Sequence, residues 1–162
     1  MIKQSGDPIT RRNFTKDPSK LPLVVVLNNL RSLYNVGSIF RTSDAVGVEK
    51  IWLCGITGTP PDNQISKTAL GAEKTVPWEY RHSALPLIKE LKGKKYQIIL
   101  LEQTENSIPY QEFQPDSPLC LVVGNEIKGV CDEILPYCDI SIEIEMAGIK
   151  NSLAKLSCNC NI

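Results

Sequence analysis

Three polar side chains that could act together follow short apolar runs of the chain. Asn35 and Arg41 come after the run at 23–27, and Glu126 comes after the run at 119–123. A carboxylate such as that of Glu126 can accept hydrogen bonds within its own loop, or can hold Arg41 in position by a charge-assisted pair. Taken singly, an asparagine before a helix is usually a cap and an arginine on a helix is usually a solvated charge. Only the combination therefore indicates a functional site.

Glycines around Glu126 indicate a loop that a ligand could reach. Gly124 and Gly129 bracket the residues 125–128. Because glycine has no Cβ, a ligand can approach its backbone closely, and the N–H groups of a compact loop can meet a carboxylate or a ribose. We therefore predict that the segment 124–129 contributes to a ligand site.

The elements that must position these side chains form a strand–helix–strand unit. The run 23–27 is β-branched and too short for a helix, so it predicts a buried strand of a parallel sheet. Asn35 is expected to cap a helix that Gly47 ends, and 50–54 predicts the next strand. Such units are right-handed and parallel, and ligands bind in the loops at the carboxyl ends of their strands.

The rest of the chain continues this α/β pattern, and we expect one parallel sheet with helices on both faces. The predicted strands are 96–101, 119–123 and 139–144, and the predicted helices are 64–70, 83–91 and a short helix at Ile134 and Leu135 that Pro136 breaks. Pro77 restricts the segment 75–80 to an edge strand, and the proline-punctuated stretch 107–118 is expected to be a connection. Residues 1–21 are predicted to be a loosely structured arm, and residues 22–162 a single domain.

Net charge does not indicate a nucleic-acid partner, because 18 lysines and arginines balance 18 aspartates and glutamates. Binding to a polyanion would therefore depend on local clusters of cations. One candidate cluster near the N-terminus is Arg11, Arg12, Lys16 and Lys20, and a second is Arg31, Arg41, Lys67 and Lys74. Either set could equally be ordinary solvated charge, and the second needs the fold to bring its members together.

The six cysteines are expected to be reduced and to bind no metal. Cys54 and Cys120 lie in or beside apolar strands, where a thiol behaves as a small apolar group. No Cys-x-x-Cys pair exists, and the single histidine, His82, has no cysteine near it in the sequence. The N-terminal residues lack the apolar core of a signal peptide, and no apolar stretch reaches the roughly 18 residues of a membrane span. We therefore expect a soluble cytoplasmic protein.

The chain has neither the glycine-rich dinucleotide motif nor a phosphate-binding P-loop, which counts against nicotinamide or nucleoside triphosphate chemistry. Three other segments resemble the signature motifs of the SpoU (TrmH) family of RNA ribose 2′-O-methyltransferases, in the SPOUT superfamily. They are NVGSIFRT at 35–42, LCLVVGNEIKGV at 119–130 and IEIEMAGIKNSL at 142–153, in the order that the family has them. The resemblance implies a SPOUT-type fold with a C-terminal trefoil knot and a homodimer. It also implies S-adenosylmethionine as the cofactor and a ribose 2′-hydroxyl of tRNA or rRNA, rather than DNA, as the substrate.

The resemblance further implies roles for individual residues. Arg41 would be catalytic: a guanidinium is too basic to accept a proton at neutral pH, so Arg41 would bind the adjacent phosphate and polarise the hydroxyl, or would act as a base only when strongly desolvated. Asn35 would orient Arg41 or the ribose, and Glu126 would complete the catalytic group. The implied cofactor-binding residues are Glu102, Gly124, Ile144, Met146, Ser152 and Leu153. The segment 65–73 would lie near the substrate, although a simple tight connector would have a similar sequence.

The third motif departs from the family pattern. Glu145 stands where the family has proline, Ala154 stands where it has asparagine, and residues 155–160 do not continue the apolar helix found there in the family. Loss of the asparagine would remove one or two hydrogen bonds of about 0.5–1.5 kcal/mol each. We therefore expect a methyltransferase whose C-terminal end is either weakened or altered but working.

Two alternatives stay open. One is a non-catalytic RNA-binding module on the same fold, which would have no need of a formed cofactor cleft. The other is a small-molecule-binding α/β protein, which would bind no RNA even at low salt.

Overall fold

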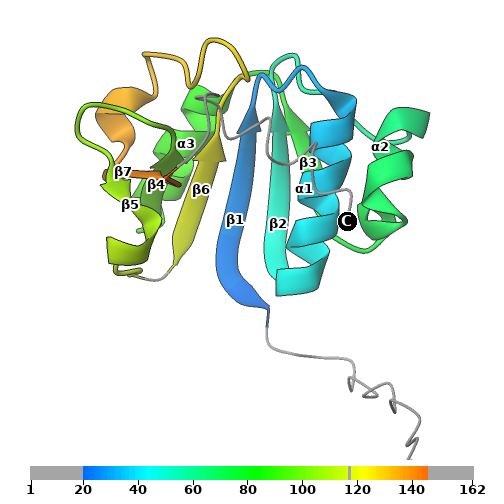
Figure 1. Cartoon of the computed structure of the whole chain (residues 1–162), viewed down its shortest axis with the longest axis horizontal. Coiled ribbons are helices and arrows are strands. Elements are labelled where there is room, and N and C mark those ends of the chain that lie inside the picture. Colours follow the sequence, from blue (N-terminus) through cyan, green and yellow to red (C-terminus); the bar gives the residue numbers. More distant parts are fainter. Residues whose placement is uncertain (1–19, 117, 146–162) are drawn as a thin grey trace, which may run out of the picture.

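The computed structural model describes residues 20–116 and 118–145, which form one seven-stranded sheet whose neighbouring strands are all parallel. The strand order is β3-β2-β1-β6-β4-β7-β5 (Figure 1). The strands are β1 Leu21–Asn28, β2 Val48–Cys54, β3 Trp78–Arg81, β4 Gln97–Leu101, β5 Ile108–Pro109, β6 Leu119–Val123 and β7 Ile140–Glu143. The predicted α/β class with a parallel sheet is confirmed.

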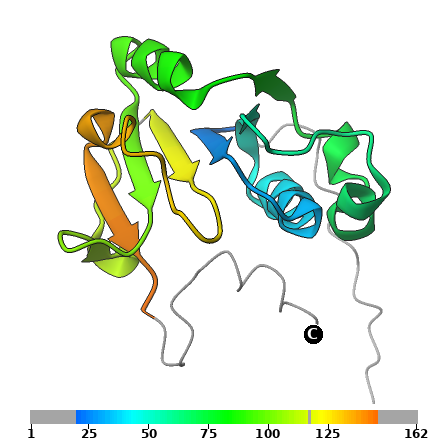
Figure 2. The ribbon, with the colours of Figure 1, turned by 90° about the horizontal axis from the view of Figure 1, so that it is seen from above.

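Helices cover both faces of the sheet. Figure 2 shows α1 (Leu33–Val46) and α2 (Asn63–Ala69) on one face and α3 (Ala84–Gly93) on the other. The short 3-10 helices are η1 Ala72–Lys74, η2 Tyr110–Glu112 and η3 Leu135–Tyr137. Each face of the sheet therefore has its own apolar core.

The interior strand β1, which lies between β2 and β6, is buried on both faces. Val25 and Leu27 pack with Phe40 of α1, whereas Val24 and Val26 belong to the cluster on the α3 side. Because both faces of β1 are covered, its sequence is an unbroken apolar run rather than an alternating one.

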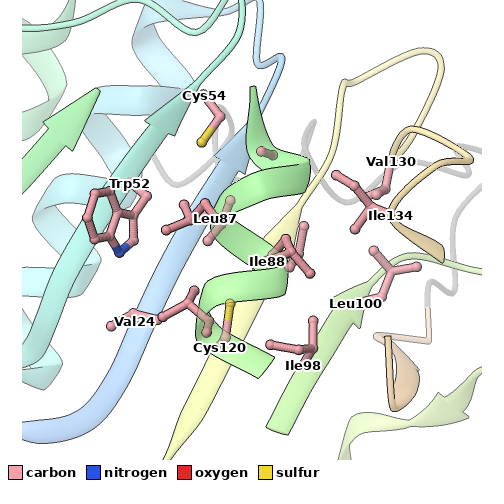
Figure 3. Close-up of a cluster of buried hydrophobic side chains, with 14 residues drawn as sticks. Val24, Trp52, Cys54, Leu87, Ile88, Ile98, Leu100, Cys120, Val130 and Ile134 are labelled. Carbon is pink, nitrogen blue, oxygen red and sulfur yellow. The ribbon is translucent and has the colours of Figure 1, made fainter. Parts of the chain in front are cut away.

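The cluster on the α3 side contains two buried cysteines. Figure 3 shows Leu87 and Ile88 of α3 packed among side chains of the central strands, including Cys54 and Cys120. Burial raises the pKa of the Cys54 thiol to about 12 and also raises the pKa of Cys120. Both thiols are therefore held in the neutral form and act as core side chains.

The start of α1 differs from the prediction. Ser32, not Asn35, is the N-cap, and its side-chain Oγ accepts the backbone N–H of Asn35 at 3.2 Å. Asn35 lies in the first turn, where its side chain is buried. The end of α1 is as predicted, because Gly47 adopts the left-handed conformation with φ of 73°.

Two further predictions fail in the second half of the chain. The stretch 107–118 contains a short strand, β5, which pairs with β7 and was not expected. Pro136 lies inside η3 instead of breaking a helix, because proline is tolerated in the first turn.

The edge strand expected at 75–80 is β3, which follows Pro77 and pairs with β2 at the edge of the sheet.

The proposed arm falls outside the described residues except for Lys20 and Leu21, and Leu21 already begins β1. Residues 146–162, where the resemblance implies the knot, lie outside the described part of the chain.

Candidate functional site

A cavity opens where the winding of the chain changes direction. The strands β1 and β6 are neighbours in the sheet. From β1 the chain continues to β2 toward one edge of the sheet, whereas from β6 it continues to β7 toward the other edge. Ligands of open α/β sheets bind beyond the carboxyl ends of the strands at such a point. The cavity has a volume of about 590 Å³, which is ordinary for a small-molecule site.

The cavity lies between α1 and the sheet. Its wall on the sheet side is apolar and consists of Leu23, Val25, Val48, Leu101, Leu121, Val123 and Ile142. The side formed by α1 consists of Ser38, Ile39, Thr42, Ser43 and Val46. The site therefore combines an apolar wall with hydroxyl groups on one helix.

Three loops from three strands add polar groups to the cavity. Glu102 follows β4, the segment 124–127 follows β6, and Glu143 and Ile144 end β7 or follow it. Three of the predicted cofactor-binding residues, Glu102, Gly124 and Ile144, thus line one cavity. They are far apart in the sequence, and the parallel sheet brings them to one edge.

Backbone N–H groups of the loop after β6 form hydrogen bonds within the loop itself. Asn125 and Gly129 each donate a backbone N–H to the other's carbonyl at 2.9 Å. The Oδ1 atom of Asn125 accepts the N–H groups of Ile127 at 2.9 Å and Lys128 at 3.0 Å. The prediction that the N–H groups of this loop meet a ligand is therefore wrong for these four residues.

The two glycines of the loop are explained by internal packing. An ideal Cβ on Gly124 would lie 2.5 Å from the carbonyl carbon of Gly129 and 2.5 Å from the nitrogen of Val130. Gly129 has φ of 72°, and a Cβ there would lie 1.8 Å from Oε1 of Glu102. The loop's own backbone therefore approaches Gly124 too closely to leave room for a side chain.

Glu102 has both a structural contact and a place in the cavity wall. Its Oε2 atom accepts the backbone N–H of Val130 at 3.0 Å, which braces the end of the loop after β6. The same side chain lines the cavity.

Glu126 joins the loop after β6 to the start of α1. Its carboxylate accepts the backbone N–H groups of Arg31 at 2.9 Å and Ser32 at 3.0 Å, and the side-chain Nδ2 of Asn35 at 3.2 Å. Burial raises the pKa of Glu126, but the hydrogen bonds that its carboxylate accepts, from Arg31, Ser32, its own backbone and Asn35, together outweigh burial and place the pKa below its ordinary value. A carboxylate at this position also interacts favourably with the helix dipole.

Arg41 is not paired with Glu126. It is an exposed residue of α1 that does not line the cavity, although its neighbour Thr42 does. The ion pairs within the described ranges lie elsewhere and are Lys50–Glu79, Arg81–Glu79, Lys92–Asp139 and Lys94–Glu90. Of the two predicted roles for Glu126, accepting hydrogen bonds is the one that the structure has. Its donors include its own backbone N–H and groups at the entrance of α1.

A second junction between loops was missed in the sequence. Asn29 follows β1 with φ of 61°, and its Oδ1 accepts the N–H of Ile56 at 3.1 Å. Its carbonyl accepts the Nδ2 of Asn125 at 2.8 Å. Asparagine tolerates positive φ better than most residues, so an asparagine directly after a strand was the available signal.

The helix α2 packs closely on α1 at Gly37. An ideal Cβ on Gly37 would lie 2.0 Å from Oγ1 of Thr68 and 2.3 Å from the carbonyl oxygen of Ile65. Thr68 also donates its hydroxyl to the carbonyl of Tyr34 at 2.9 Å. Glycine at this position therefore allows α2 to lie directly against α1.

This packing gathers cations on one layer of the molecule, which we call the α1–α2 layer (residues 31–46 and 62–75). Its exposed cations are Arg31, Arg41, Lys67 and Lys74, and none of them forms an ion pair with another described residue. Its carboxylates are engaged in local hydrogen bonds: Asp44 with Thr75, Asp62 with the start of α2, and Glu73 with Ser66 and Gly71. The second predicted cation cluster thus lies on one layer.

Comparison with known proteins identifies the family. Residues 22–154 match the sequence model of the SpoU rRNA Methylase family. The chain belongs to this family. A protein of Staphylococcus haemolyticus assigned to the TrmH family of tRNA/rRNA methyltransferases is 33% identical over 138 residues, which cover 85% of this chain and 55% of the relative. The chain thus spans about half the length of the curated relatives it matches.

Solved structures agree with this assignment to the SpoU family. The TrmH/SpoU tRNA modifying enzyme of A. aeolicus is 30% identical, with a TM-score of 0.75 over 85% of this chain and 71% of that one. The AdoMet-bound rRNA methyltransferase of Sinorhizobium meliloti is 25% identical, with a TM-score of 0.75 over 83% of this chain and 52% of that one.

As a SpoU-family chain, the protein brings its motif segments together at the cavity. The segments 35–42 and 119–130 meet through Glu126, and the segment 142–153 begins in the cavity wall. Met146, Ser152 and Leu153 lie outside the described residues.

Neither a metal site nor a membrane span occurs in the described part of the chain. Residues 20–116 and 118–145 contain no group of three or more histidines, cysteines or carboxylates that could hold a metal ion. No helix within the same ranges is long and apolar enough to cross a membrane.

Proposed function

We propose that this chain is the methyltransferase domain of an enzyme that methylates a ribose 2′-hydroxyl in tRNA or rRNA with S-adenosylmethionine. The observation that carries the proposal is the cavity, which gathers motif residues of a SpoU-family chain around one space. The relatives support it, since they are assigned to tRNA/rRNA methyltransferases or modify tRNA.

The cavity fits the chemistry of S-adenosylmethionine. Leu101, Val123 and Ile142 offer an apolar surface to an adenine ring, and Glu102 and Glu143 bring carboxylates to the wall. Carboxylates attract the positive charges of a sulfonium and an amino group. When bound, S-adenosylmethionine supplies an electrophilic methyl group.

Arg41 acts in this proposal on the RNA side of the reaction. Its guanidinium stays protonated, so it binds the phosphate beside the target ribose and polarises the 2′-hydroxyl. Its exposure on α1 supports phosphate binding over the role of a base, because a base would require strong desolvation.

RNA binds, in this proposal, to the α1–α2 layer. Four exposed cations lie there, and none of them forms an ion pair with another described residue. Phosphate groups of RNA fit such a surface because affinity for a polyanion depends on clustered cations rather than on net charge. The proposal includes a cytoplasmic homodimer, as the family resemblance implies, and analytical ultracentrifugation of the full chain tests the dimer.

Calorimetric titration of the full chain with S-adenosylhomocysteine is the first test, because it does not require the RNA to be known. We expect binding in the micromolar range, which corresponds to about −8 kcal/mol. A folded chain that binds bulk tRNA or rRNA but not S-adenosylhomocysteine would overturn the proposal in favour of a non-catalytic RNA-binding module. The variant Ala154→Asn restores the residue that the family has. Stronger binding of S-adenosylhomocysteine by this variant would show that the altered third motif lowers the affinity for the cofactor.

Methyl transfer is the second test. The full chain is incubated with labelled S-adenosylmethionine and either bulk tRNA or bulk rRNA, and the product nucleosides are separated. We expect label in a 2′-O-methyl nucleoside. Label on a base would contradict the proposed ribose chemistry while leaving the cofactor assignment intact.

A further inference from the structure

The loop after β6 and the entrance of α1 are joined at two points. Glu126 accepts hydrogen bonds from Arg31, Ser32 and Asn35, all at or near the start of α1. Asn125 donates its Nδ2 to the carbonyl of Asn29 at 2.8 Å. Two segments that are far apart in the sequence are thus linked directly, since Arg31 and Glu126 are separated by 95 positions.

The segment that carries Glu126 is a compact unit. Its ends are paired through the Asn125 and Gly129 backbones, its tip is held by Asn125 Oδ1, and Glu102 braces its exit at Val130. Because these bonds fix the loop internally, a displacement of one part of it moves the part that holds α1.

The same loop forms part of the cavity wall. Gly124, Asn125, Glu126, Ile127 and Gly129 all line the cavity, and Ile127 is 76% exposed. A ligand in the cavity therefore contacts the unit that carries Glu126. An apolar side chain with that exposure also gains buried area when a ligand covers it.

We infer that Glu126 is a positioning residue that couples occupancy of the cavity to the order of the α1 entrance, residues 29–36. A bound ligand orders the loop after β6. Through the Glu126 carboxylate, this loop then orders the backbone at the start of α1, the helix that carries Arg41. The identity of the ligand as S-adenosylmethionine or its product rests on the proposed function; the coupling rests on the contacts of Glu126.

The coupling has a reciprocal consequence. If ligand in the cavity orders residues 29–36, then a partner that binds the α1–α2 layer and orders the same residues tightens binding in the cavity by the same factor. Both binding events depend on the order of residues 29–36, and hydrogen exchange measures that order.

The test is hydrogen exchange of the full chain, measured on peptides covering 29–36, with and without saturating S-adenosylhomocysteine. The N–H groups of Arg31 and Ser32, which donate to Glu126, fall in this segment. We expect the ligand to slow their exchange about fivefold or more. Calorimetry on the same sample establishes that the ligand is bound, so absence of binding would count against the proposed function and not against the coupling.

Variants separate coupling from direct contact. Glu126→Gln is expected to raise exchange at 29–36 in the free protein and to remove the response to ligand, measured at a ligand concentration that calorimetry shows to saturate the variant. Asn125→Asp keeps the Oδ1 acceptor that holds the loop and loses the donor to Asn29, and we expect a partial loss of the response. Glu133→Gln changes an exposed carboxylate a few residues beyond the loop and should respond as the unchanged protein does.

Two outcomes would overturn the inference. One is ligand binding by the unchanged protein without slower exchange at 29–36. The other is a full response in Glu126→Gln, which would mean that α1 senses the ligand directly through its cavity-lining residues Ser38 and Thr42. If Glu126→Gln does not fold, as judged by circular dichroism, Asn125→Asp decides between the same outcomes.

Discussion

At the scale of single residues, Arg41 can be removed without disturbing the fold. Its side chain is exposed and forms no ion pair with another described residue, so Arg41→Ala should change the free energy of unfolding by no more than about 0.5 kcal/mol. Methyl transfer should fall by at least about 100-fold, because a charge that stabilises the reacting group is lost. S-adenosylhomocysteine affinity should be retained. Arg81→Ala is the arginine control: it removes an arginine of the edge strand β3 that contacts Glu79 and the Trp52 ring, outside the α1–α2 layer. A loss of methyl transfer equal to that of Arg41→Ala would contradict the role of Arg41.

Gly124 is a cavity-lining residue at which a single added methyl group should be destabilising. A Cβ there would lie 2.5 Å from the backbone of Gly129 and Val130, which cannot move without breaking the loop. We expect Gly124→Ala to cost about 1–3 kcal/mol of unfolding free energy and to weaken cofactor binding. Gly93→Ala, at the end of α3 with no neighbour within 4 Å of its Cβ, should be neutral or stabilising. Urea unfolding of both variants gives the comparison.

At the scale of elements, the junction between the β6 loop and α1 should weaken in acid. The pKa of Glu126 lies below the ordinary value of 4.5 in the folded state, so the folded protein binds this proton less readily than the unfolded chain does. The carboxylate therefore adds stability above pH 4.5, and this contribution is lost as the pH falls through the folded-state pKa. Unfolding free energies at neutral and acidic pH should differ less in Glu126→Gln than in the unchanged protein. Glu133→Gln should keep the original difference.

The α1–α2 layer should dominate the salt dependence of RNA binding. Lys67→Ala combined with Lys74→Ala removes two exposed cations of this layer. We expect weaker binding of bulk tRNA and a decrease of about 1–2 in the slope of log affinity against log salt concentration. Lys94→Ala removes a cation that is paired with Glu90 on α3, across the sheet, and should leave the slope unchanged. Equal slopes for the double variant and the unchanged protein would exclude this layer as the RNA surface.

At the scale of the whole molecule, the sheet shields the cysteines of its core. Cys54 and Cys120 are fully buried between the sheet and α3. Burial also raises the pKa of Cys54 to about 12, so almost no thiolate exists near neutral pH. Native protein treated with iodoacetamide should therefore not be alkylated at either residue, whereas protein unfolded in guanidinium should be alkylated at both. Mass spectrometry of the peptides gives the result, and native alkylation at the unfolded rate would contradict the described core.

Most elements could be predicted from the sequence because their signals are local. The strand at 119–123 was predicted with its observed bounds, and Gly47 ends α1 as expected, since an apolar run and a helix-ending glycine act on their own neighbours. The two-residue strand β5 could not be found in this way. It exists because β7 lies beside it, and its own sequence, Ile108–Pro109, carries no strand pattern.

The residues of the candidate site could be named from the sequence, but their contacts could not. Asn35 was expected to cap α1, and Ser32 does so instead. The asparagine side chain turns to Glu126, 91 residues away along the chain. Both residues are good caps by type, so local chemistry does not choose between them.

The sequence by itself determined the α/β class, the buried strand β1 and the motif residues of a SpoU-family chain, because apolar runs, turn residues and motif spacing are properties of neighbouring positions. The tertiary structure decided that Glu126 accepts hydrogen bonds from the start of α1 and does not pair with Arg41. It also decided that the backbone at Gly129 and Val130 packs against Gly124, where a side chain would not fit. The physical reason is that β6 inserts beside β1 in the sheet. That insertion alone brings the two loops into hydrogen-bonding distance, and contacts between such distant segments leave no periodic pattern in the sequence.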